Sequence, residues 1–130
     1  MNNGQRVIAV ASAAEAATGL GLLAVPSLIV ALLLGMEPAG IALVLSRVAG
    51  IALIALAIAC WPGAGARESA KPYLAMLLYN SLVALVLAEV GINGEMSGVL
   101  LWPTAIAHFV IAILIAWTWF RMGTAKGPDA

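Results

Sequence analysis

Four long apolar runs, separated by short polar segments, constrain this chain more than any other feature of its sequence. They cover Val7–Leu34, Ile41–Trp61, Pro72–Ile92 and Val99–Phe120. A helix needs about 20 apolar residues to cross the hydrocarbon core of a bilayer, which is about 30 Å thick. The runs are rich in Ala and Leu and lack the alternation of a membrane β-barrel. We therefore predict an all-α protein, an integral membrane bundle of four transmembrane helices that forms a single domain over residues 1–130.

The composition agrees with a place in the lipid bilayer. Hydrophobic residues make up 64% of the chain and charged residues only 9%, whereas soluble domains carry about 25% charged residues. The net charge of +0, without a cluster of Lys or Arg, argues against a nucleic-acid partner. Cys60 is the only cysteine, so an intrachain disulfide is excluded, and we expect its side chain to be a buried apolar group.

The first run is too long for one straight crossing, because at about 1.5 Å per residue it would reach about 40 Å. Pro26 lies inside it, and proline breaks or kinks a helix. We predict a span over residues 7–25, followed by a short helix over residues 26–34 that begins with proline and lies along the outer interface. The alternative is one tilted helix with a kink at Pro26.

The loop charges predict the orientation. Five of the six cations flank the runs on one side of the membrane, namely Arg6, Arg67, Lys71, Arg121 and Lys126. The two loops on the other side contain Glu37 and Glu95 but no Lys or Arg. The positive-inside rule then places both termini in the cytoplasm. With loops this short, we expect a multi-pass protein of the cell inner membrane of a bacterium.

Two charged residues within the runs share a level near the outer surface. Arg47 lies about 9 Å and Glu89 about 5 Å from it, counted along the helices. Charges in hydrocarbon are costly and normally face the bundle interior, so we predict a buried ion pair between the second and third spans. Two alternatives stay open: Arg47 binds an anion or a lipid headgroup, or its side chain reaches out to the interface.

A second polar group lies deeper. It comprises Glu15, Asn80 and His108, with Tyr79, Ser12 and Thr18 nearby. A lone carboxyl about 12 Å deep should be protonated, and a neighbouring imidazole could exchange that proton, as in a proton relay. The alternative is a neutral Glu15 and a neutral His108 that hydrogen-bond across helices and serve packing. The sequence does not decide whether Glu15 and His108 share one cavity.

Small residues recur every fourth position of the first span, at Ala9, Ala13, Ala17 and Gly21. In lipid, helices associate through such small residues, so we predict a packing face here, for this bundle or for a partner chain. One His and one Cys cannot build a zinc or bis-histidine haem site within one chain. We therefore expect no metal, no cofactor and, with no soluble domain to host catalysis, no enzymatic activity.

Two short resemblances involve Glu15. A carboxylate in the first of four short membrane helices resembles the small multidrug resistance transporters, in which it binds protons and cationic drugs, but their aromatic cage is missing here. The segment Glu15-Ala-Ala-Thr-Gly19-Leu-Gly21-Leu-Leu resembles part of the DoxX-like four-helix bacterial proteins. Neither match is long enough to assign the chain to a family.

The sequence therefore leads to two alternative predictions of function. The first is a non-enzymatic membrane protein, either an accessory or structural subunit or a bundle that holds a lipid-like ligand, in a homo-oligomer or a larger membrane complex. The second is a proton-coupled transporter of small amphipathic molecules that acts as an oligomer through Glu15. A water-accessible cavity around Glu15 would favour transport, and dry packing would favour the first version.

Overall fold

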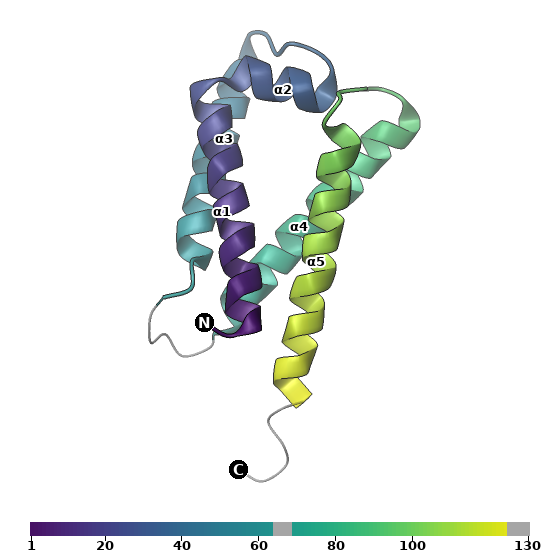
Figure 1. Ribbon diagram of the computed structural model, residues 1–130. Helices are drawn as coiled ribbons and strands as arrows, with labels where there is room; N and C mark the ends of the chain where they lie inside the picture. The colour runs from purple at the N-terminus through teal and green to yellow at the C-terminus, as the bar shows by residue number, and fades with distance from the viewer. Residues whose placement is uncertain (64–68, 125–130) are drawn as a thin grey trace.

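The computed structural model describes residues 1–63 and 69–124, except for the side chains of residues 122–124. The described residues form five helices: α1 (Asn3–Ala24), α2 (Pro26–Leu34), α3 (Ile41–Cys60), α4 (Ala70–Asn93) and α5 (Leu101–Thr124) (Figure 1). Four of them, all except α2, are long and apolar enough to cross a membrane. The all-α prediction is confirmed for this part of the chain.

Local hydrogen bonds explain where the helices differ from the apolar runs. α1 begins before Val7 because Asn2 and Gln5 form a capping box, each side chain accepting from the other residue's backbone N–H. α5 begins at Leu101 rather than Val99. The backbone N–H of Leu100 donates to the carbonyl of Leu32 in α2, so residue 100 is held outside the helix.

The chain leaves the helical conformation at Val25, where φ is −135° and ψ is 58°. Proline disfavours the helical conformation in the residue before it and fits the first position of a helix, which explains why α1 ends and α2 begins here. α2 then runs across the ends of the long helices (Figure 1). Its last carbonyls, of Leu32 and Leu34, accept from the backbone N–H groups of Leu100 and Ser97 at 2.8 and 3.2 Å.

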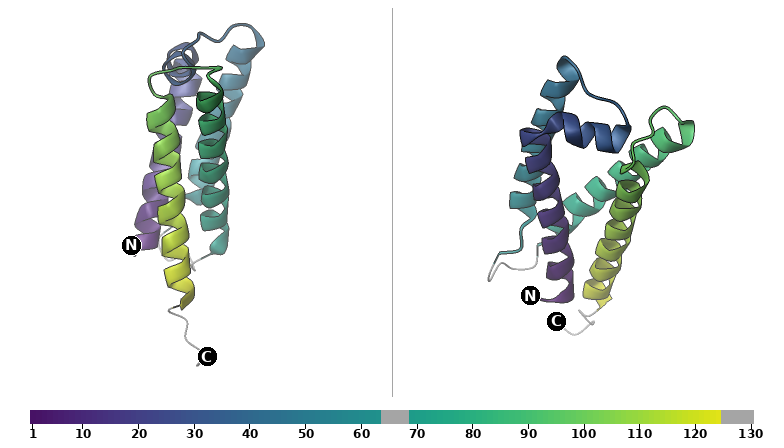
Figure 2. Two further views of the ribbon diagram at one scale, coloured as in Figure 1. Left: turned by 90° about the vertical axis from the view of Figure 1, so that its right-hand side faces the viewer. Right: turned by 45° about the horizontal axis from the view of Figure 1, so that its top comes forward.

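The long helices form two antiparallel pairs, α1 with α3 and α4 with α5, and α1 also contacts α4 and α5 (Figure 2). α1 and α3 approach closely at Gly19 and Gly50, where a Cβ atom on Gly19 would lie 2.6 Å from the carbonyl oxygen of Gly50. Ala13 and Ala17 are exposed, so the internal version of the packing face predicted for α1 is wrong, and its use against a partner chain stays a prediction. α1 is rotated so that Ser12 and Glu15 are buried, and its buried set is Gly4, Ile8, Ala11, Ser12, Glu15 and Gly19.

The apolar core lies at the end of the bundle where the chain starts. Its buried members are Ile8, Ala11, Cys60, Tyr73, Met76 and Ile115. Residues from all four long helices meet there, and the rings of Tyr73 and Trp119 pack edge to face with centroids 6.1 Å apart. The expected burial of Cys60 is confirmed, with 3% of the residue exposed.

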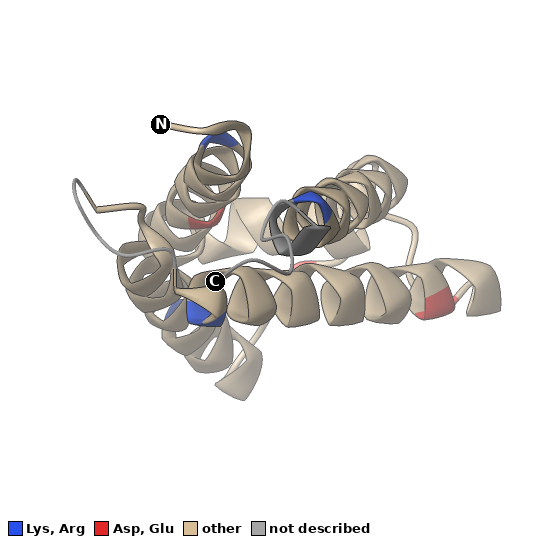
Figure 3. Ribbon diagram, turned by 90° about the horizontal axis from the view of Figure 1, so that it is seen from below, with Lys and Arg blue, Asp and Glu red and all other residues tan. Residues whose placement is uncertain are grey.

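Basic residues gather at this same end. Arg6 lies in the first turn of α1, Lys71 in the first turn of α4 and Arg121 near the end of α5, where its guanidinium lies 4.2 Å from the centre of the Trp117 ring (Figure 3). Arg67 and Lys126 lie outside the described residues. The fold therefore places three of the four described cations at one end of the bundle.

Candidate functional site

Three helices bring four of the candidate residues together. Glu15 comes from α1, Tyr79 and Asn80 from α4, and His108 from α5. The Nδ1 atom of His108 lies 2.8 Å from Asn80 Oδ1 and 3.8 Å from Glu15 Oε1. The rings of Tyr79 and His108 meet edge to face with centroids 5.8 Å apart. We call these four residues the polar cluster.

The polar cluster is almost closed to the surroundings. Asn80 and Glu15 are 0% and 2% exposed, and the His108 side chain is 14% exposed. The Tyr79 hydroxyl is within hydrogen-bonding range of the Glu15 carboxyl. Thr18 does not take part, because it is exposed and its hydroxyl donates to the carbonyl of Ala14 at 3.0 Å.

The hydrogen bonds of Asn80 determine where His108 carries its proton. The Asn80 Nδ2 group donates to the carbonyl of Met76 at 2.9 Å, which leaves Asn80 Oδ1 as an acceptor facing His108. His108 Nδ1 must therefore carry a hydrogen and donate it, and in the neutral ring Nε2 is the unprotonated nitrogen. The nitrogen nearest to Glu15 is thus already a donor and cannot take a proton from the carboxyl in this arrangement.

The contact between Glu15 and His108 has consequences for the charge of the cluster. At 3.8 Å it exceeds the range of a hydrogen bond, and it is an ion pair only if His108 is protonated. Burying two charges costs more than burying two neutral hydrogen-bonding groups. The geometry therefore favours a neutral cluster that ties α4 to α5 and places Glu15 of α1 against both.

The structure does not bring Arg47 and Glu89 together. Both are exposed, and no ion pair joins them within the described part of the chain. The expected pairing assumed that consecutive spans are packed neighbours, but α3 packs along α1 and α4 along α5. A buried ion pair between α3 and α4 is therefore absent from this arrangement.

Removing the two outer charges should have independent effects. Arg47→Leu and Glu89→Leu do not share a contact, so we expect their changes in the free energy of unfolding to add within about 0.5 kcal/mol. Unfolding of the single and double variants in mixed micelles measures this sum. A double variant much more stable than the sum predicts would show that the charges interact.

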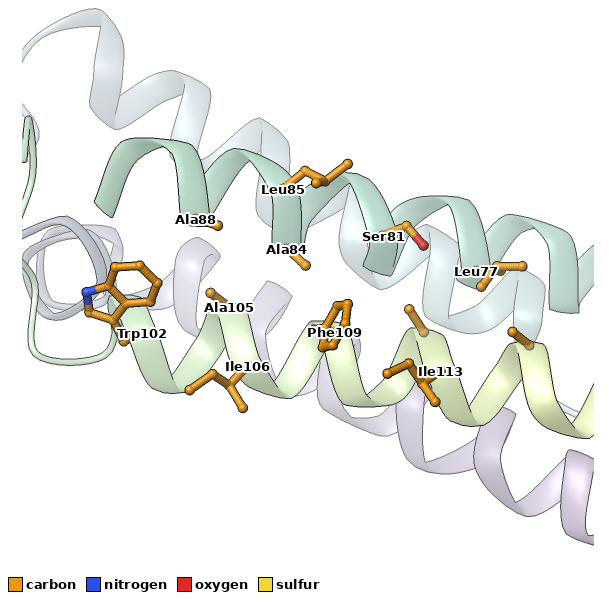
Figure 4. Close-up of a pocket in the computed structure, with 12 residues that line it drawn as sticks. Leu77, Ser81, Ala84, Leu85, Ala88, Trp102, Ala105, Ile106, Phe109 and Ile113 are labelled. Atoms are coloured by element: carbon orange, nitrogen blue, oxygen red, sulfur yellow. The ribbon is translucent and has the colours of Figure 1, made fainter. Parts of the chain in front are cut away.

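An apolar groove, which sequence reasoning missed, runs between α4 and α5 (Figure 4). Its volume is about 600 Å³. Alanines from both helices form the floor where the pair is close, and larger apolar side chains such as Ile106 and Phe109 flank them. Among its lining residues only Ser81 and Trp102 carry a polar side-chain atom. The signal was present as alanines spaced four apart, at Ala84 and Ala88 and at Ala112 and Ala116.

Within the parts of residues 1–121 that the structure describes, no group of three or more His, Cys, Asp or Glu side chains is placed to hold a metal ion. Searches against protein-family models, curated proteins and solved structures find no match to this chain. The two resemblances that involve Glu15 therefore gain no support.

Proposed function

We propose that this chain is a non-enzymatic membrane protein that holds a hydrocarbon chain of a lipid-like ligand in the groove between α4 and α5. The observation that carries the proposal is the groove itself. Its volume of about 600 Å³ falls in the range of small-molecule sites, about 300–1,000 Å³. Its lining is apolar over nearly its whole length, as a hydrocarbon chain requires.

The two polar atoms of the groove suggest how such a ligand is held. Trp102 lies in the first turn of α5, at one end of the groove, and tryptophan favours the level of the lipid headgroups (Figure 4). Its indole N–H can donate to a polar head, and the Ser81 hydroxyl lies further along α4. The polar cluster, being almost closed, acts in this proposal as the contact that holds the helices together.

Filling the groove should displace the ligand. Ala88→Phe adds a ring at a lining position, so we expect at least about tenfold less copurifying lipid-like ligand, equivalent to about 1.4 kcal/mol of binding free energy. Ala107→Phe is the matched control, because Ala107 is exposed on α5 and does not line the groove. Native mass spectrometry from mild detergent measures the retained ligand. Equal retention by the two variants would overturn the proposal.

We further propose that both termini face the cytoplasm, that α2 lies along the outer interface and that the membrane is the inner membrane of a bacterium. The basic residues at the end that holds the N-terminus support this orientation. Cysteines placed at Glu37 and Glu95 in a Cys60→Ala background should react with an impermeant maleimide in intact cells. A cysteine at Arg67 should react only after lysis. Labelling of position 67 in intact cells would show that the protein has the opposite orientation.

A second candidate function is proton-coupled transport of small amphipathic molecules by an oligomer; the ionisable carboxyl of Glu15, buried to 2% exposure in the middle of a span, supports it, with an acceptor other than His108 Nδ1. Glu15→Gln keeps the shape of a protonated carboxyl but cannot titrate. In proteoliposomes with a pH gradient, this variant should then lose uptake of tetraphenylphosphonium, and His108→Gln should lose part of it. Uptake that is absent from the parent protein, or equal in parent and Glu15→Gln, would rule out this function.

A further inference from the structure

Two polar atoms on α1 are buried without a hydrogen-bond partner in the described part of the protein: Ser12 Oγ and Glu15 Oε1. Ser12 is 0% exposed and Glu15 is 2% exposed. The residues are three positions apart, so their side chains lie on one face of the helix. Buried polar groups in folded proteins almost always bond to protein atoms or to ordered water. Both atoms therefore need an explanation.

The polar cluster leaves both atoms without a partner, because Glu15 Oε1 has no hydrogen bond even though the Tyr79 hydroxyl is within reach of the Glu15 carboxyl. The hydrogen on His108 Nδ1 is given to Asn80 Oδ1, which leaves none for Glu15 Oε1 at 3.8 Å. The Nδ2 group of Asn80 is directed to the carbonyl of Met76. The described residues thus provide no partner for Ser12 Oγ or Glu15 Oε1, which points to a bound molecule.

We propose that Ser12 and Glu15 bind one internal water molecule beside His108. A water molecule donates two hydrogen bonds and accepts two, so it can give a hydrogen to Glu15 Oε1 while it bonds to the Ser12 hydroxyl. The guest must be small, because the neighbouring residues Ile8 and Ala11 are only 2% and 0% exposed. A bound cation would require further oxygen ligands, and the nearby Asn80 Oδ1 already accepts from His108.

The sign of one stability change tests this proposal. If Ser12 holds the water, Ser12→Ala removes one of its anchors, and the thermal midpoint in nanodiscs should fall by about 4 °C. If the hydroxyl is unpaired, the same substitution removes a buried unpaired group, and the midpoint should stay or rise. A constant or higher midpoint therefore overturns the proposal. Ser46→Ala is the matched control, because its hydroxyl already donates to the carbonyl of Ala42 at 2.8 Å.

Two measurements on the unaltered protein identify the guest. Magnetisation transfer from water to the labelled side chain of Glu15 should be seen by NMR in the parent protein and should be lost in Ser12→Ala. Its absence from the parent protein contradicts the proposal. The thermal midpoint should also be equal in sodium chloride and choline chloride at one ionic strength, since a midpoint that rises with sodium would show that the guest is a cation.

Discussion

Replacing Gly19 by Ala should lower the free energy of unfolding by about 2 kcal/mol, because the added methyl group has no room between α1 and α3. A Cβ atom there would lie 2.6 Å from the Gly50 carbonyl oxygen and 2.9 Å from Ile54 Cγ1. The nearest atom belongs to a backbone, so one helix must move away from the other. Unfolding in mixed micelles, followed by circular dichroism, measures the loss.

Gly21→Ala is the matched control for this prediction. It makes the same change on the same helix, but its Cβ atom would meet only the side chain of Ile29, at 3.0 Å, which can shift. Alanine is the better helix former by about 1 kcal/mol, so this variant should be as stable as the parent protein or slightly more stable. Equal losses for the two variants would show that the contact between Gly19 and Gly50 is not close.

Glu15→Lys should be the most damaging single change within the polar cluster, with a loss of about 3 kcal/mol. It places an ammonium group where Glu15 is 2% exposed and where His108 Nδ1 already directs a hydrogen toward Asn80. The position lies near the middle of α1, so the lysine side chain has a long way to either interface. The free energy of unfolding in mixed micelles checks the size of the loss.

Glu15→Gln provides the comparison. Glutamine keeps the length of the side chain, can accept from the Tyr79 hydroxyl and can donate through its amide group, so its stability should lie within about 1 kcal/mol of the parent protein. The proposed function also requires that this variant retains the groove ligand. A Glu15→Lys protein as stable as the Glu15→Gln protein would mean that position 15 is open to water.

The elements of the fold were predictable, and the pairing of the helices was not. The apolar runs and Pro26 gave the helices to within a few residues, because span length and the missing proline N–H are local properties. The neighbours of each helix depend on side-chain shape. The stripe of Ala13 and Ala17 suggested one face of α1, but the need to bury Ser12 and Glu15 rotated the helix and brought Gly19 against Gly50.

Depth along the helices predicted the contacts of the polar cluster but not those of Arg47 and Glu89. Glu15, Asn80 and His108 are polar residues at matching depths. Burying a polar side chain alone among apolar ones is costly, so these three residues contact one another. Arg47 and Glu89 also match in depth, but depth does not say on which side of a helix a residue lies. The groove depends on where the alanines of α4 face the alanines of α5. The sequence of one helix does not show which residues of the other helix lie opposite it.

The hydrogen bonds at the end of α2 impose an order on biogenesis. The carbonyls of Leu32 and Leu34 receive their donors from Leu100 and Ser97, respectively, which the ribosome adds two helices later, after α3 and α4. Gly98 lies so close to the backbone of Leu33 that a side chain would not fit between them. Gly35 caps the end of α2 by donating to the carbonyl of Ala31, but a nascent chain that ends after α3 still lacks the donors for the carbonyls of Leu32 and Leu34. These hydrogen bonds form only when α4 and α5 have been made, so the end of the structure that contains α2 is completed last.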